Sequence, residues 1–108
     1  MTPAPDTRWV DVAIPVDHPS FAGHFPRAPV LPGVVLASLV MQAIARDAGM
    51  SGRLGPTPRI DELKFLAPVG PGTALRIGLT AREHGVGFEI QRGTTTVARG
   101  RLSAAMRP

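Results

Sequence analysis

The chain has 108 residues, of which 44% are hydrophobic and 19% are charged, and these values predict one globular domain with a single core. It contains no cysteine, which excludes disulfides, thiolate metal sites and a cysteine nucleophile. The net charge is +4, but the arginines are scattered from Arg8 to Arg107 and aromatic residues are few, so a nucleic-acid-binding protein is not favoured. The positive charge has two possible explanations. It can reflect an arginine-rich composition alone, or it can serve to attract an acidic partner protein or an anionic ligand weakly.

The N-terminal segment and the apolar segments give no sign of secretion or membrane insertion. Residues 1–7 are expected to be flexible, and they lack the basic start and apolar stretch of a secretory signal. The longest apolar run, Val34–Ala45, is interrupted by Ser38 and Gln42 and is shorter than the roughly 20 residues that span a bilayer. We therefore expect a cytoplasmic location for the whole domain, residues 1–108.

The first half of the chain predicts one strand, one loop and one helix. Alternating apolar residues predict a strand over Trp9–Ile14, and residues 17–31 form a loop rich in proline and glycine. Pro32 is expected to lie at or near the first helical position, and the helix is expected to continue to about Ala48 and stop at Gly49. A linker is expected to follow.

The second half predicts four antiparallel strands, separated in part by short hairpin turns. They are expected over Arg59–Leu66, Ala74–Arg82, Val86–Arg92 and Thr95–Ala104. One long helix followed by a run of strands is typical of an α+β fold.

The predicted helix is apolar around most of its circumference, so we expect it to be buried on most sides. Its polar residues Ser38, Gln42 and Arg46 recur at every fourth position and share one narrow stripe. A central helix wrapped by a curved antiparallel sheet fits this pattern. The polar stripe must then face either a cavity or a second subunit.

Two segments carry a family resemblance. FAGHFPRAPVLPGVVLASLVMQA (residues 21–43) and IDELKFLAPVGPGTALRI (residues 60–77) resemble, in this order, the motifs of the 3-hydroxyacyl-[acyl carrier protein] dehydratases, which have the hot-dog fold. Two residues depart from the family pattern. Arg27 replaces a glycine, and Ser38 stands where the family places its catalytic glutamate or aspartate. The short chain is most similar to small accessory dehydratases, such as those of aryl polyene pigment clusters.

The resemblance implies that the protein removes water from a 3-hydroxyacyl thioester to give the trans-2-enoyl thioester. This reaction needs a base at C2, an acid for the departing hydroxyl and a donor to the thioester oxygen. His24 matches the base, since an imidazole suits proton abstraction at neutral pH. The Gly33 N–H, at the start of a helix, matches the oxygen donor. Ser38 occupies the acid position, but the pKa of a hydroxyl is too high for a strong acid.

The missing acid has to come from elsewhere if the chain is active. Asp47 is expected on the opposite side of the helix from Ser38, and Asp61 is expected to be structural. In the family, each site forms at a dimer interface with the histidine and the acid from different chains. A heterodimer with a paralogous hot-dog subunit would therefore complete the site.

The remaining site assignments follow from the resemblance and from the composition. The residues expected to contact the substrate are Phe25, Pro32, Val34 and Gln42. We expect no metal, because the three histidines have no matched acidic partner, and no cofactor other than the phosphopantetheine arm of the substrate. The expected partners are an acyl carrier protein or CoA thioester, and a second hot-dog chain in a homodimer or heterodimer.

Alternatives stay open for three single residues and for the function of the whole chain. His24 can be a loop histidine bonded to backbone, Gly33 a plain turn glycine, and Gln42 an interface amide. The whole chain can be a catalytically impaired partner subunit, which Ser38 suggests. After the dehydratase and the partner subunit, the third possible function is a hot-dog thioesterase, although thioester hydrolysis normally needs a carboxylate at the position of Ser38.

Overall fold

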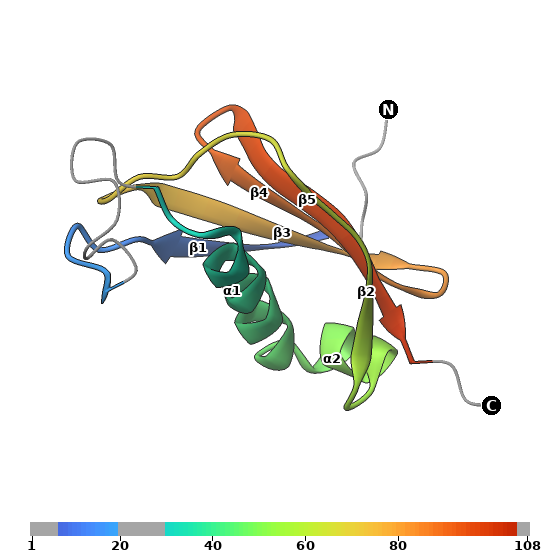
Figure 1. The fold of residues 1–108 in the computed structure, drawn as a ribbon. Coiled ribbons are helices and arrows are strands. Elements are labelled where there is room, and N and C mark those ends of the chain that lie inside the picture. The colour runs from blue at the N-terminus through green and yellow to red at the C-terminus, as the bar shows by residue number, and fades with distance from the viewer. Residues whose placement is uncertain (1–6, 20–29, 106–108) are drawn as a thin grey trace.

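The computed structural model describes residues 7–19 and 30–105, which form one antiparallel sheet with two helices against one of its faces (Figure 1). The strands are β1 (Thr7–Ala13), β2 (Pro58–Phe65), β3 (Ala74–Arg82), β4 (Gly85–Arg92) and β5 (Thr95–Ala104), and the helices are α1 (Gly33–Ala45) and α2 (Ala48–Leu54). The strand order is β1-β3-β4-β5-β2, so β1 and β2 are the edge strands. The predicted α+β class is confirmed.

The alternation of side chains along the strands determines which face of the sheet is buried. In β3, Leu75, Ile77 and Leu79 are fully buried and belong to the same core as Leu36 and Val40 of α1. The residues between them in β3 lie on the opposite face. The core therefore occupies the space between the helices and the sheet.

The sequence-based boundaries hold for the strands but not for the helix. Each predicted strand is present within one or two residues, and the last four strands pair as β3-β4-β5-β2 rather than in chain order. The predicted helix ends at Ala45 instead of Ala48, and Gly49 lies inside α2 instead of terminating α1. Met50 and Leu54, expected in a linker, are buried one turn apart in α2.

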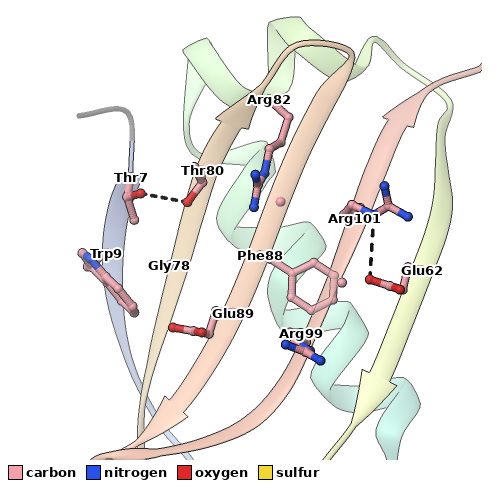
Figure 2. A pocket seen from close by; sticks show the side chains of 12 residues that line it. Thr7, Trp9, Glu62, Gly78, Thr80, Arg82, Phe88, Glu89, Arg99 and Arg101 are labelled. Carbon is pink, nitrogen blue, oxygen red and sulfur yellow. Dashed lines mark hydrogen bonds and ion pairs between the residues drawn. The ribbon is translucent and has the colours of Figure 1, made fainter. Parts of the chain in front are cut away.

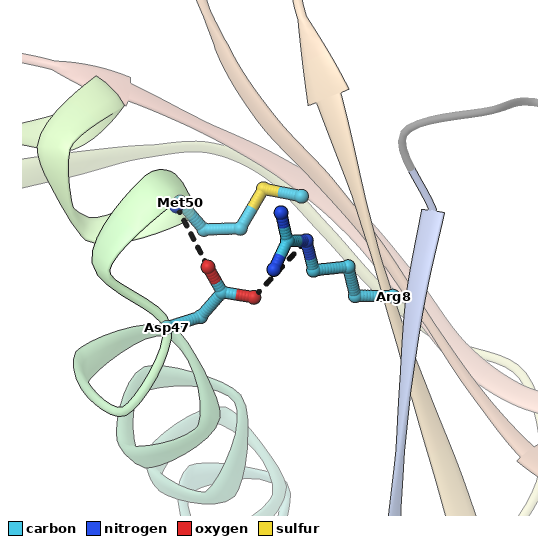
Figure 3. Close-up of polar contacts among 3 residues, drawn as sticks. All are labelled: Arg8, Asp47 and Met50. Carbon is cyan, nitrogen blue, oxygen red and sulfur yellow. Dashed lines mark hydrogen bonds and ion pairs between the residues drawn. The ribbon is translucent and has the colours of Figure 1, made fainter.

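Asp47 explains the break between the two helices. It has extended φ and ψ angles of −113° and 104°, and its Oδ1 accepts a hydrogen bond of 3.2 Å from the Met50 backbone N–H. Asp47 is thus the N-cap of α2. Its Oδ2 lies 3.5 Å from Arg8 Nε, so it also links the helices to β1 (Figure 3). The expectation that Asp47 does not act at the Ser38 position agrees with this role.

We expect Asp47→Ala to lower the free energy of unfolding by about 1 kcal/mol, because α2 loses its cap. Asp47→Asn is the matched control, since asparagine also caps helices but does not pair with Arg8. It should cost only a few tenths of a kcal/mol, since the Arg8 side chain is mostly exposed. Urea unfolding of the two variants measures both values. Equal losses would show that the ion pair, and not the cap, stabilises this junction.

Candidate active site

The N-terminus of α1 presents backbone amides that have no hydrogen-bond partner among the described residues. Pro32 is the N-cap, with φ −60° and ψ 145°, and no side chain caps this end of the helix. The first helical hydrogen bonds run from the Val35 and Leu36 amides to the Pro32 carbonyl oxygen, at 3.0 and 3.4 Å. The Gly33 and Val34 amides precede these bonds, at the positive end of the helix dipole. They are placed to donate to a partly negative oxygen.

Phe65, at the end of β2, lies directly against Gly33. A Cβ atom at Gly33 would be 2.6 Å from Phe65 Cζ, so the ring fits only because residue 33 has no side chain. The Phe65 side chain is half exposed. Phe65 lies in the second family-like segment but was not among the predicted site residues.

The segment before α1 is anchored by the loop between β2 and β3. The buried Leu31 donates its backbone N–H to the carbonyl oxygen of the buried Val69, at 2.8 Å. The neighbouring Pro68 carbonyl accepts a hydrogen bond from the Arg92 guanidinium at the end of β4. Arg92 therefore helps to fix the loop that positions the start of α1. No sequence pattern connects Arg92 with Leu31, so sequence reasoning missed it.

The predicted polar stripe of α1 is exposed in the single chain. Val34, Ser38 and Gln42 lie one turn apart on one side of α1, and Val34 is 75% exposed. Gln42 Nε2 donates to Ser38 Oγ at 3.2 Å. Because Ser38 Oγ accepts this bond, its own hydroxyl hydrogen remains available to donate. The structure therefore places Ser38 and Gln42 on the open side of α1 and Gly33 at the N-terminal end of the same helix.

Apolar side chains surround this stripe. Ile60, Phe65 and the adjoining Leu66 are each about half exposed at the β2 edge of the sheet. We call the surface formed by Val34, Ser38, Gln42, Ile60, Phe65 and Leu66 the α1–β2 face. An exposed edge strand beside exposed apolar side chains is typical of an interface.

The space between α1 and the β2 side of the sheet is almost filled. The hollow there has a volume of about 10 Å³, enough for roughly one water molecule. Its lining is apolar and consists of Ala37, Val40, Met41, Ile60, Leu63, Phe88 and Leu102. This hollow has no room for an acyl chain.

The carboxylates near the site are engaged elsewhere. Asp61 Oδ1 lies 2.9 Å from Arg59 Nε, and Glu62 lies within 4 Å of Lys64 and Arg101. The neighbouring Ser103 side chain, and then the Arg59 guanidinium, hold the pKa of Asp61 below its usual value. Among the described residues, no carboxylate contacts the Ser38 side chain. The expected structural role of Asp61 fits these contacts.

The other site assignments have different outcomes. His24 and Phe25 lie outside the described residues. His84 is exposed beside Glu83 in the turn between β3 and β4. Within 7–19 and 30–105, no three histidine or acidic side chains come together as metal ligands.

No single helix in the described ranges is long and apolar enough to cross a membrane. Taken together, α1 and α2 have the length and the apolar composition of a membrane span, but the two helices are bent by 109° relative to each other.

A five-stranded antiparallel sheet of this order, with its main helix packed on one face, is the hot-dog fold. A family model described as ApeI-like, ApeI dehydratase, matches residues 2–101, and the chain belongs to this dehydratase family. A 3-hydroxyacyl-[acyl-carrier-protein] dehydratase FabZ of Rhizorhabdus wittichii is 34% identical over an alignment of 99 residues that covers 82% of this chain and 56% of that protein. The FabZ of Granulibacter bethesdensis is 40% identical over an alignment of 85 residues that covers 71% of this chain and 49% of that protein. The chain thus spans about half the length of these curated relatives.

Solved structures show the same architecture. The dehydratase heterocomplex ApeI:P from Xenorhabdus doucetiae superposes with a TM-score of 0.73 at 26% identity, over 95% of this chain and 90% of that chain. The dehydratase domain of PpsC from Mycobacterium tuberculosis, in complex with C12:1-CoA, has a TM-score of 0.66 at 23% identity, over 99% of this chain and 41% of that chain. The second likeness concerns the fold alone.

Proposed function

We propose that this chain is a subunit of a 3-hydroxyacyl-thioester dehydratase that acts on an acyl carrier protein or CoA thioester. The observation that carries the proposal is the open start of α1, where the Gly33 amide lies beside Phe65 and five residues before Ser38. Family membership supports the reaction class. The reaction needs no cofactor other than the phosphopantetheine arm that carries the substrate.

In the proposed mechanism, His24 removes the C2 proton of the substrate. The Gly33 N–H donates to the thioester oxygen while negative charge accumulates there. The C3–O bond then breaks, the C2–C3 double bond forms, and the hydroxyl leaves as water after it gains a proton. The Ser38 hydroxyl, which accepts from Gln42, can donate a hydrogen bond to the departing oxygen but is too weak an acid to supply that proton.

We place the missing acid on a second hot-dog chain that covers the α1–β2 face. The exposed apolar side chains of this face support the pairing, and the hollow beneath α1 cannot hold the acyl chain. The similarity to a chain of the ApeI:P heterocomplex supports a heterodimer. The second candidate function, a catalytically impaired partner subunit that stabilises an active paralogue, is favoured by Ser38 itself.

A dehydration assay tests the proposal. The protein is assayed alone and mixed with a hot-dog subunit that has an acid at the Ser38 position, on 3-hydroxyacyl thioesters of carrier protein and of CoA. We expect turnover in the mixture and a loss of about 10²–10⁴-fold in His24→Ala. Turnover that is unchanged in His24→Ala would assign this chain to the impaired-partner function. Release of free thiol without enoyl product would instead indicate a thioesterase.

A further inference from the structure

A second site lies on the face of the sheet opposite α1. The hollow there has a volume of about 370 Å³ (Figure 2). Strand register places its lining in two adjacent rows that cross the sheet. The first row is Thr7, Thr80, Gly87, Arg101 and Glu62, and the second is Trp9, Gly78, Glu89 and Arg99. No sequence motif marks this hollow, because its residues come from all five strands.

Two glycines form the floor of this hollow. A Cβ at Gly78 would be 2.8 Å from the Trp9 ring, and a Cβ at Gly87 would be 2.8 Å from Arg82 Nε. Trp9 and Arg82 therefore lie low over the sheet, as the close-up also shows (Figure 2). Since Gly87 pairs with Arg101, the Arg82 side chain is brought to the same part of the sheet as Arg101.

The charges in the hollow leave an excess of guanidinium groups. Glu62 lies 3.7 Å from Arg101, and Glu89 accepts a 2.6 Å hydrogen bond from Gln91. Among the described residues, Arg82 and Arg99 have no carboxylate within 4 Å of their guanidinium groups. Three arginines and two glutamates therefore line the hollow, which leaves one excess positive charge, and two of the arginines have no carboxylate at ion-pair distance.

We propose that this hollow binds a phosphate group, either free or as the monoester of a small molecule, through Arg82, Arg99 and Arg101. The guanidinium groups come from three different positions around a glycine floor, and a tetrahedral phosphate offers oxygens in several directions at once. The Thr80 hydroxyl, bonded to Thr7 at 2.8 Å, adds a further polar group at the rim. Glu62 and Glu89 beside the arginines repel an extended polyanion, which limits the ligand to a small one.

The test is a titration of the 15N-labelled full chain, followed by backbone amide shifts, at constant ionic strength set with chloride. The probes are inorganic phosphate and glycerol 3-phosphate. We expect saturable shifts at Thr80, Gly87 and Arg101, with a dissociation constant on the order of 1 mM. Tighter binding of glycerol 3-phosphate would identify a phosphate monoester as the ligand, and equal binding would identify free phosphate.

Two variants make the titration specific. Arg99→Gln should weaken binding about tenfold, since one charge-assisted contact is lost. Arg46→Gln, at the far end of α1, is the matched control with the same change of net charge, and it should bind as the wild type does. The amide spectrum of each variant verifies its fold. Shifts that do not saturate, or an equal weakening in both variants, would overturn the proposal.

Discussion

Ser38→Glu is expected to raise the dehydration rate of the chain assayed alone by about 10²–10⁴-fold, the usual contribution of a positioned general acid. The structure favours this gain because residue 38 points to the open side of α1. Gln42 Nε2, which now donates to Ser38 Oγ at 3.2 Å, can donate to the new carboxyl group instead. The readout is the rate of enoyl thioester formation from a 3-hydroxyacyl thioester.

Ser38→Gln is the matched control for this gain. Glutamine has the length and the hydrogen-bonding groups of glutamate but has no proton to transfer at neutral pH, so its rate should stay at the wild-type level. The double variant Ser38→Glu with His24→Ala should lose the gain, because the C2 proton then has no base. A gain in Ser38→Gln equal to that in Ser38→Glu would rule out acid catalysis at this position.

Gly100→Ala is expected to lower the free energy of unfolding by about 3 kcal/mol or more. A Cβ at Gly100 would lie 2.1 Å from the backbone oxygen of Glu62 in β2 and 2.6 Å from the Phe88 ring. Because a paired backbone cannot move aside as an exposed side chain does, the strain must separate β2 from β5. The midpoint of urea unfolding measures the loss.

Gly52→Ala is the control for this prediction. Nothing lies within 4 Å of a Cβ at Gly52, which is inside α2, so alanine should stabilise the protein by about 0.5–1 kcal/mol through its higher helix propensity. The two substitutions add the same methyl group and should shift the urea midpoint in opposite directions. A destabilising Gly52→Ala would show that α2 does not depend on local helix propensity.

The sequence predicted the fold class because each strand has its own alternation of apolar and polar residues. It did not predict α2, since Gly49 and Gly52 are typical of a loop. The signals for this helix were the cap at Asp47 and the apolar pair Met50 and Leu54. The pairing of β2 with β5 was also not predictable. The alternation of apolar and polar residues shows which face of a strand is buried, but it does not show which strand lies next to it.

The candidate site was predicted where it lies within one continuous segment. Ser38 and Gln42 are four residues apart, so their common side of α1 could be derived in advance, and the position of Gly33 at the helix start followed from Pro32. The contact of Phe65 with Gly33 depends on the docking of an edge strand, and the Arg92 contact depends on a loop 24 residues away in sequence. Neither contact could be predicted, because each joins residues from segments that are far apart in the sequence.

The anchoring of Leu31 has a consequence for the order in which the molecule folds. Leu31 is held by Val69, and the loop of Val69 is held in turn by Arg92, at the end of β4. Contacts between residues so distant in sequence form late, because a long loop must close first. During synthesis, the start of α1 therefore acquires its final position only after β4 has left the ribosome, so the Gly33 amide becomes ordered long after it has itself been synthesised.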